Sequence, residues 1–379
     1  MEDQFYEDLE ELENDYRSKL TTLETFCSKL HQLLSELLDG NSIKTHLVEF
    51  RVKTVESFMN KVMRDGKHYS EPMNKITDQC GLRIILFYPS DVDTACNMID
   101  REFHVLPEYS TDKRTLLNTD QFGYLSVHKV VTLKKNRSNL KEWASFAPLK
   151  AEIQIRTVLQ HSWAAISHEL QYKHENEIPS SFRRKLVRLS GLLELADEEF
   201  QDLKNERKNL VAQLTYDIAA SNLSVELNLD SLLQYFSTSE IVEKIIPQLE
   251  KIGYEHDEDY PFFYSDHKSS QTLLISNLIG LKKLEELDGV LEKGSKNALK
   301  FFKEFFAVHT KGDPEHNISG STDHWIAMLL VGIVSSTITK DSLKETLPWV
   351  ESYLDDIIKI GRSNFKDSAK HAPKVDEKS

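Results

Sequence analysis

Near-continuous apolar runs alternate with helix-like stretches between about residues 43 and 172, and this pattern constrains the fold more than any other. The run LRIILFY, residues 82–88, contains one charge, Arg83. Such runs are typical of strands in a sheet that is covered on both faces. We therefore expect an α+β segment here.

Helical patterns lie on both sides of this segment. Apolar residues recur at helical spacing from Phe5 to about Leu38, where Asp39 and Gly40 form a stop signal. A second long helix is expected after Pro179, with a stripe of Phe182, Leu186, Leu189, Leu193 and Ala196. The predicted domains are an N-terminal helix (1–42), an α+β domain with a trailing helix (43–215), a helical domain (228–361) and a disordered tail (362–379).

The region after Asn228 is predicted to be all-α. Ser237 and Glu240 fit a capping box at a helix start. The apolar run WIAMLLVGIVSSTI, from Trp325, is too short and too rich in Ser and Thr to span a bilayer, so we expect a buried helix and no membrane partner.

Composition restricts the cellular setting and the kind of binding site. A chain of 379 residues with 40% hydrophobic residues can form two full cores, and its net charge of -14 requires a local basic site for any polyanion. Cys27, Cys80 and Cys96 form no C-x-x-C pair, which argues against a disulfide framework or structural zinc. These features, with an acidic N-terminus unlike a signal peptide, favour a reducing cytoplasm.

A basic cluster lies in RVKTVESFMNK, residues 51–61. Arg51 and Lys53 precede a helix expected to begin near Thr54, and Ser57 and Lys61 would lie one turn apart on it. Ammonium groups, a hydroxyl and helix N–H groups could then converge on a polyphosphate. An exposed amphipathic helix would have the same pattern.

Two strands contribute carboxylates. Asp78 precedes the strand that contains Gly81 and Arg83, and Gly81 has no side chain to block a ligand. In KAEIQIRT, residues 150–157, Glu152 and Gln154 share one face of the second strand. Asp78 and Glu152 together could hold one Mg²⁺, although a solvated edge strand would also alternate in this way.

A third polar strand lies in FGYLSVH, residues 122–128. Tyr124, Ser126 and His128 would lie on one face, with Tyr124 as a stacking surface for a base and His128 as a donor to phosphate or ribose. A half-buried strand with internally satisfied polar groups is the alternative.

These stretches occur in an order that resembles the synthetase domain of the RelA/SpoT family. The motifs RVKTVESFMNK, DQCGLRI, FGYLSVH, AEIQIRT and HSWAAISHELQYK carry the resemblance, which covers about residues 43–210. It implies a nucleotidyltransferase-like mixed sheet with flanking helices. The implied reaction transfers the β,γ-pyrophosphate of ATP to the 3′-hydroxyl of GDP or GTP, making (p)ppGpp.

The resemblance also implies roles for individual residues. Arg51 and Arg83 would enclose the adenine of ATP, with Lys53, Ser57 and Lys61 on its phosphates. Asp78 and Glu152 would hold Mg²⁺, and Glu152 would accept the proton of the attacking hydroxyl. Tyr124 would stack on the acceptor base, with His128 near the phosphates.

Two departures leave alternatives open. Asp120 occupies a position that is usually basic in alarmone-making enzymes, which leaves tRNA or another nucleotide as a possible acceptor; Lys113 and Arg114 are near enough in sequence to substitute. The family's hydrolase domain has no counterpart in the short N-terminal segment. A catalytically dead nucleotide sensor is a further alternative.

Other assignments are less specific. We expect Leu159, Trp163, Ile166 and Leu170 to form a core stripe, and a lone His256-Asp257 pair does not predict a metal site. The C-terminal helices are hypothesised to restrain the synthetase or to bind a protein regulator, and a homo-oligomer is compatible with the sequence.

Overall fold

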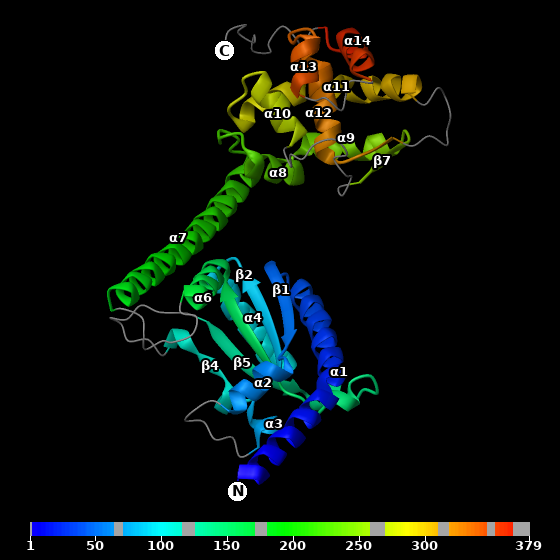
Figure 1. Cartoon of the computed structure of the whole chain (residues 1–379). Coiled ribbons are helices and arrows are strands. Elements are labelled where there is room, and N and C mark those ends of the chain that lie inside the picture. The colour runs from blue at the N-terminus through cyan, green and yellow to red at the C-terminus, as the bar shows by residue number, and fades with distance from the viewer. Residues whose placement is uncertain are drawn as a thin grey trace. The chain divides into compact units, whose positions relative to one another are not determined.

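The computed structural model describes residues 2–63, 71–115, 126–170, 180–257, 270–309, 318–346 and 353–366. The chain divides into two compact units, Met1–Asn205 and Glu206–Ser379. Figure 1 shows a sheet with helices in the first unit and mainly helices in the second. The predicted domain boundaries stay a prediction.

The N-terminal unit is built on a six-stranded mixed sheet in the order β1-β2-β6-β5-β3, with β4 paired to β5. β2 and β6 are parallel, and the other pairs are antiparallel. The α+β prediction is therefore confirmed. The strands are β1 (Thr45–Val52), β2 (Cys80–Leu86), β3 (Phe103–Val105), β4 (Thr111–Asp112), β5 (Val127–Leu133) and β6 (Ala151–Thr157).

Helices α1 (Glu2–Gly40) and α4 (Pro89–Glu102) supply the apolar partners of one sheet face. Leu30 and Leu34 of α1 and Ile99 of α4 are fully buried in the same core as Leu82 and Ile153 of the central strands. The residues between these on β2 and β6 point to the opposite face, because side chains alternate along a strand. That opposite face has polar residues and forms the candidate site.

The remaining helices of this unit connect or extend the sheet. These helices are α2 (Val55–Val62), α3 (Pro72–Lys75), α5 (Lys135–Ser138), α6 (Val158–Leu170) and α7 (Ser180–Ala219). Helix α7 continues into the second unit.

The C-terminal unit is helical, with one small parallel pair that the sequence did not predict. Strands β7 (Tyr254–His256) and β8 (Ile318–Gly320) form this pair. The helices are α8 (Leu229–Thr238), α9 (Glu240–Glu250), α10 (Gln271–Leu278), α11 (Leu284–His309), α12 (Thr322–Val334), α13 (Lys340–Thr346) and α14 (Leu354–Asn364).

Helix α12 confirms the buried helix expected at Trp325, since all of its residues from His324 to Val334 are buried. In contrast, the predicted capping box is wrong: Ser237 lies inside α8, and Ser239 is the N-cap of α9. Among the described helices, none is both long enough and apolar enough to cross a membrane.

The expected absence of a disulfide is also wrong. Cys27 of α1 and Cys80 of β2 form one, with Cα atoms 5.8 Å apart. They are 53 residues apart in sequence, so no local spacing indicates the pair. The packing of α1 against the start of β2 brings them together.

Candidate active site

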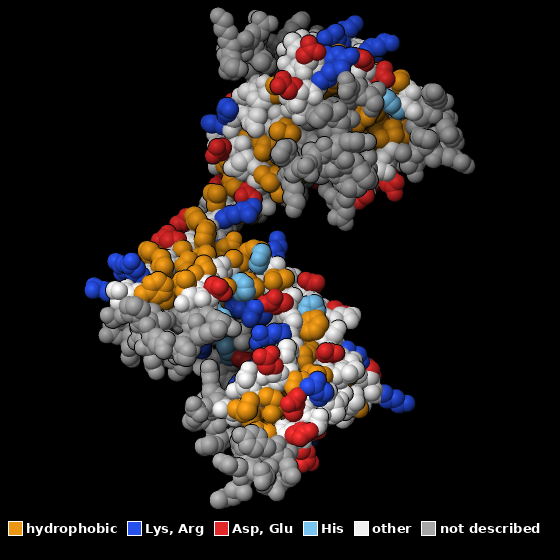
Figure 2. Space-filling model, in the orientation of Figure 1, with side chains coloured by type: hydrophobic (Ala, Val, Ile, Leu, Met, Phe, Trp, Pro, Cys, Tyr) orange, Lys and Arg blue, Asp and Glu red, His pale blue; other side chains and the backbone are white. Residues whose placement is uncertain are grey.

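Two rows of side chains cross the polar face of the sheet. In one row, Arg51 of β1 lies opposite Gly81 of β2, which lies beside Glu152 of β6. In the next row, Glu49, Arg83, Gln154 and His128 follow in the same way across β1, β2, β6 and β5. Figure 2 shows basic, acidic and histidine side chains gathered in a hollow of this unit. The strand register therefore brings residues from four sequence motifs together.

Asp78 is held between two lysines at one end of this face. Lys53 Nζ lies 2.9 Å from Asp78 Oδ2, and Lys61 Nζ lies 2.9 Å from Oδ1. Burial by itself raises the pKa of Asp78, but the hydrogen bonds and positive charges of both lysines outweigh it and lower the pKa below its usual value. Asp78 is therefore ionised at neutral pH, beside two cations.

Glu152 is held by a histidine. His128 Nδ1 lies 2.6 Å from Glu152 Oε1. Burial raises the pKa of Glu152, while the hydrogen bond and charge of His128 lower it more, so the net shift is downward. His128 Nε2 is buried and has no hydrogen-bond partner among the residues that the structure describes. This nitrogen can bind an oxygen of a ligand.

The charge of Asp78 raises the pKa of Glu152, which shows that the two carboxylates lie close enough to influence each other. The donor set fits Mg²⁺, which prefers carboxylate and phosphate oxygens. The described residues contain no group of three His, Cys, Asp or Glu that could hold a metal without such phosphates. A Mg²⁺ ion here would complete its coordination with oxygens from water or a substrate.

A cleft of about 270 Å³ opens at strands β1, β2 and β6, lined by Glu49, Phe50, Arg51, Gly81, Leu82, Arg83 and Gln154. Both arginines predicted to enclose adenine thus line one cleft. Arg83 forms an ion pair with Glu49 across the strands. A Cβ atom added at Gly81 would meet only the Arg51 carbonyl oxygen, at 3.6 Å, so the backbone tolerates a side chain but the cleft would lose space.

Helix α2 begins where the sequence predicted. Thr54 is the N-cap, and its side-chain oxygen accepts a hydrogen bond from the Ser57 backbone N–H. The Ser57 side chain is exposed, while Lys61, one turn later, reaches Asp78. The basic cluster is therefore assembled from β1 and α2 around one carboxylate.

Several contributors had no signal in the sequence. Tyr16 of α1 donates a hydrogen bond to the Lys53 carbonyl at 2.7 Å and stacks on Phe58 of α2, with ring centroids 4.0 Å apart. Burial, then the charge of Asp78, raises the pKa of Tyr16 to about 12. Glu49 pairs with Arg83. Tyr16 thus fixes the segment that carries Lys53, a role visible only in the tertiary structure.

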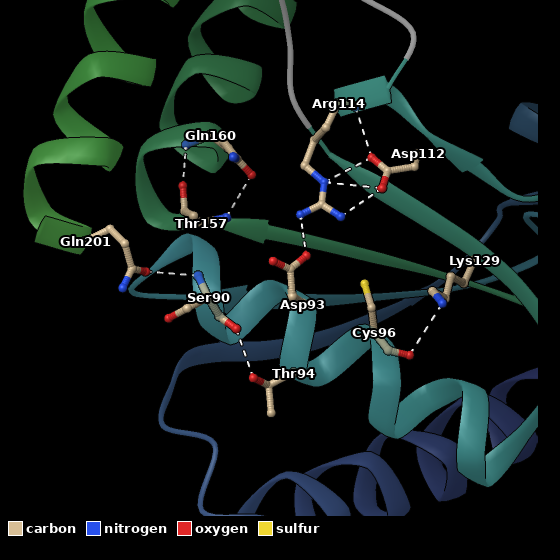
Figure 3. Close-up of polar contacts among 10 residues, drawn as sticks. All are labelled: Ser90, Asp93, Thr94, Cys96, Asp112, Arg114, Lys129, Thr157, Gln160 and Gln201. Atoms are coloured by element: carbon tan, nitrogen blue, oxygen red, sulfur yellow. Dashed lines mark hydrogen bonds and ion pairs between the residues drawn. The ribbon is translucent and has the colours of Figure 1, made fainter. Parts of the chain in front are cut away.

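Arg114, which the sequence offered as a substitute ligand for the acceptor's phosphates, is already neutralised. Its guanidinium donates to both oxygens of Asp112 and, at 2.7 Å, to Asp93 (Figure 3). The hydrogen bond from Arg114 lowers the pKa of Asp112. Arg114 would have to leave two carboxylates to bind a phosphate. Tyr124 and Asp120 lie outside the described residues, as does Lys173.

The predicted core stripe of α6 is wrong. Ile166 is 58% exposed and Leu170 is 50% exposed, while Leu159 and Trp163 are half-buried. Only Ser167 is buried in α6. Helical spacing indicated one face of α6, but the sheet does not cover it.

The sequence left two histidines without a role. His256 lies in β7, with Nε2 3.0 Å from Thr322 Oγ1, and His168 is exposed.

Known protein families and proteins match the N-terminal half of this chain. A family model described as the region found in RelA / SpoT proteins matches residues 50–177. The chain is 30% identical over 193 residues to GTP pyrophosphokinase YwaC of Bacillus subtilis (strain 168), covering 50% of this chain and 88% of that protein. It is 30% identical over 158 residues to GTP pyrophosphokinase YjbM of the same organism, covering 41% of this chain and 70% of YjbM.

Among solved structures, the crystal structure of small alarmone synthetase 1 from Bacillus subtilis matches 52% of this chain and 99% of its own, with 25% identity and a TM-score of 0.44. The sequence matches place the chain in the RelA/SpoT family: its N-terminal half contains a synthetase domain similar to small alarmone synthetases. The matched region leaves the C-terminal half unassigned. A regulatory role for that half stays a prediction.

Proposed function

We propose that this chain is a Mg²⁺-dependent pyrophosphokinase that transfers the β,γ-pyrophosphate of ATP to the 3′-hydroxyl of GDP or GTP. One observation carries the proposal: two ionised carboxylates, Asp78 and Glu152, are paired with Lys53, Lys61 and His128, and Glu152 lies in the same strand row as Arg51 and Gly81 of the cleft. The relatives YwaC and YjbM are named GTP pyrophosphokinases.

The basic residues would bind the donor. Adenine would enter the cleft between Arg51 and Arg83. Lys53 and Lys61 would exchange their ion pairs with Asp78 for ion pairs with the polyphosphate. Asp78 already holds the two ammonium groups together in the free protein, so the phosphates would meet an assembled pair of cations, and the new ion pairs would offset the loss of those with Asp78. Ser57, exposed beside the N-terminus of α2, would donate its hydroxyl to the same phosphates.

Asp78 and Glu152 would hold Mg²⁺, which neutralises developing charge on the phosphates when bound. Once the lysines move to the phosphates, Asp78 is free to serve as an oxygen ligand. No other described carboxylate has both this position and two exchangeable cations.

Glu152 would also be the base. The acceptor's 3′-oxygen forms a bond to the β-phosphorus of ATP, the bond from that phosphorus to the oxygen of AMP breaks, and Glu152 accepts the hydroxyl proton. His128 Nδ1 orients the Glu152 carboxylate in the free protein, and its unpartnered Nε2 would donate to a phosphate oxygen. Positioning and charge neutralisation are what phosphoryl-type transfer requires of a protein.

The test is a transfer assay with ATP labelled on its γ-phosphate, in which GDP, GTP, ATP and tRNA are offered separately. Label in a guanosine 3′-pyrophosphate supports the proposal. Label only in tRNA would keep the donor site and replace the acceptor. ATP binding without transfer to any acceptor would indicate a nucleotide sensor and overturn the proposal.

A further inference from the structure

A groove of about 860 Å³ opens in the C-terminal unit, outside the residues 50–177 that the family model matches. Its walls are α9 and α11, and the last turn of α7 and the end of α8 contribute further side chains. These segments all belong to the second unit, where Figure 1 labels α8, α9 and α11. Sites for small molecules have volumes of about 300–1,000 Å³. The groove is therefore large enough for one small organic ligand.

Apolar side chains from three segments line the groove. Leu223, which follows α7, Ile241 of α9 and Leu299 of α11 are half-buried, so part of each side chain is open to a ligand. Ile245 and Leu249, which follow Ile241 on the same side of α9, are buried. Such a lining favours the hydrocarbon part of a ligand, because binding removes apolar surface from water.

Two carboxylates lie on the α11 wall of the groove. Asp288 and Glu292 are one helical turn apart and therefore lie on the same side of α11. The buried Tyr235 of α8 donates its hydroxyl to Asp288 Oδ1 at 2.6 Å. Burial, this hydrogen bond and the charges of Asp288 and Glu292 raise the pKa of Tyr235. Both carboxylates therefore lie near one hydroxyl and give this end of the groove a negative potential.

The basic residues of the groove do not neutralise this pair. Lys244 of α9 is paired with Glu240 at 2.7 Å. Lys296 is exposed, one turn after Glu292. Within the described part of the C-terminal unit, neither Asp288 nor Glu292 forms an ion pair with a basic side chain. Like charges one turn apart destabilise a helix, so a cation held beside both carboxylates would stabilise this wall.

These features restrict the kind of ligand. An anion would be repelled by Asp288 and Glu292. A metal ion is disfavoured, because the described residues contain no group of three His, Cys, Asp or Glu that could hold one. We propose that the groove binds a small organic ammonium ion. Its charged group lies against the two carboxylates, and its apolar body lies against Leu223, Ile241 and Leu299. This site does not depend on the proposed transfer reaction.

The first test compares three probes of nearly equal size and different charge: phenethylammonium, phenethyl alcohol and hydrocinnamate. Isothermal titration calorimetry of the full chain measures the affinity of each. Phenethylammonium should bind with a Kd of roughly 1 mM or lower, as expected for a ligand of this size. The neutral alcohol should bind roughly tenfold more weakly, and the anion more weakly still, because only the cation is attracted by the carboxylates.

Two double variants with the same change in net charge locate the site. Asp288→Asn/Glu292→Gln removes both charges but keeps an oxygen that can accept the Tyr235 hydrogen bond. It should weaken phenethylammonium binding roughly tenfold and leave phenethyl alcohol binding unchanged. Glu243→Gln/Glu250→Gln replaces two exposed acidic residues of α9 that do not line the groove, and should change neither affinity.

A third variant blocks the groove without changing its charge. Ala219→Trp places a large ring at an exposed position of the lining, at the end of α7, and should weaken the binding of both phenethylammonium and phenethyl alcohol. Circular dichroism and thermal unfolding check that each variant is folded. If the double variant at Asp288 and Glu292 does not fold, the three probes and Ala219→Trp still decide the outcome.

The absence of saturable phenethylammonium binding overturns the proposal. So do equal affinities for the ammonium ion and the alcohol, because the carboxylates then take no part in binding. Equal weakening in the two double variants also overturns it, since the cation would then respond only to the net charge of -14 of the chain.

Discussion

The two units of the chain treat buried polar groups in opposite ways. In the N-terminal unit, two carboxylates are kept ionised by Lys53, Lys61 and His128 on an accessible sheet face. In the C-terminal unit, the fully buried polar side chains of the described residues are not Asp, Glu, Lys or Arg, as with Tyr254, whose hydroxyl donates to the Phe302 carbonyl at 2.9 Å. The charged groups of the N-terminal unit are accessible to a ligand, whereas the hydrogen-bonded polar groups of the C-terminal unit stabilise its fold.

The largest expected effect tests the charged face. Glu152→Gln should lower the transfer rate by roughly 10² to 10⁴-fold, because a base and a metal-ligand charge are lost. ATP binding should change little, since the cleft and the lysines remain. Steady-state transfer and equilibrium ATP binding measure the two effects. Glu24→Gln, at an exposed position of α1 in the same unit, is the control for the loss of one negative charge. If Glu152→Gln keeps more than about a tenth of the transfer rate of the unmodified chain, Glu152 is not the base.

The second prediction tests the apolar unit. Phe302 is fully buried and contacts Tyr254 and Trp325 edge to face. Phe302→Ala should lower the free energy of unfolding of the C-terminal unit by about 3–5 kcal/mol, because it leaves a cavity. Denaturant unfolding measures this loss. Val308→Ala, at a 48% exposed position of the same helix, should cost much less. Equal losses would mean that Phe302 is not central to this core.

The third prediction uses opposite pH dependences. Burial, opposed by a hydrogen bond from Thr157, raises the pKa of Asp197 to about 6, and burial lowers the pKa of His324 to about 4. Below pH 6 the folded state holds a proton on Asp197 that the unfolded state has released, so this group's contribution to stability rises as pH falls toward 4. For His324 the unfolded state binds the proton first, so stability is lost as pH falls from 6.5 to 4.

Unfolding of Asp197→Asn and His324→Gln at pH 7 and pH 5 isolates the two contributions. The pH-dependent difference from the unmodified chain should be on the order of 1–2 kcal/mol, with opposite sign in the two variants. The same sign in both would contradict the assigned burial of one of these groups.

The smallest expected effect concerns the cleft. Gly81→Leu should raise the KM for ATP by roughly tenfold, about 1.4 kcal/mol, because its side chain takes space between Arg51 and Arg83. Gly81→Ala is the matched control, since a Cβ fits there at ordinary contact distance. An unchanged KM for the leucine variant would place adenine outside this cleft.

Local patterns in the sequence were enough to predict the α+β segment, the long first helix, the start of α2 at Thr54 and the buried helix α12. Each depends on residues within a few turns or one strand, where apolar periodicity and capping chemistry act. The alternation of Glu152 and Gln154 with Ile153 and Ile155 likewise predicted the polar face of β6, without any knowledge of which strands pair with it. The site residues were predicted as a set because their motifs occur in the order that the RelA/SpoT family has.

Contacts between distant segments were decided only by the tertiary structure. The row from Arg51 through Gly81 to Glu152 depends on strand register, which is set by packing across the whole sheet and not by any one motif. The pairing of Asp78 with two lysines, the support of Lys53 by Tyr16 and the bond between Cys27 and Cys80 have the same origin. Periodicity shows which side of a helix is apolar, as in α6 and α7, but what covers that side depends on where the rest of the chain packs.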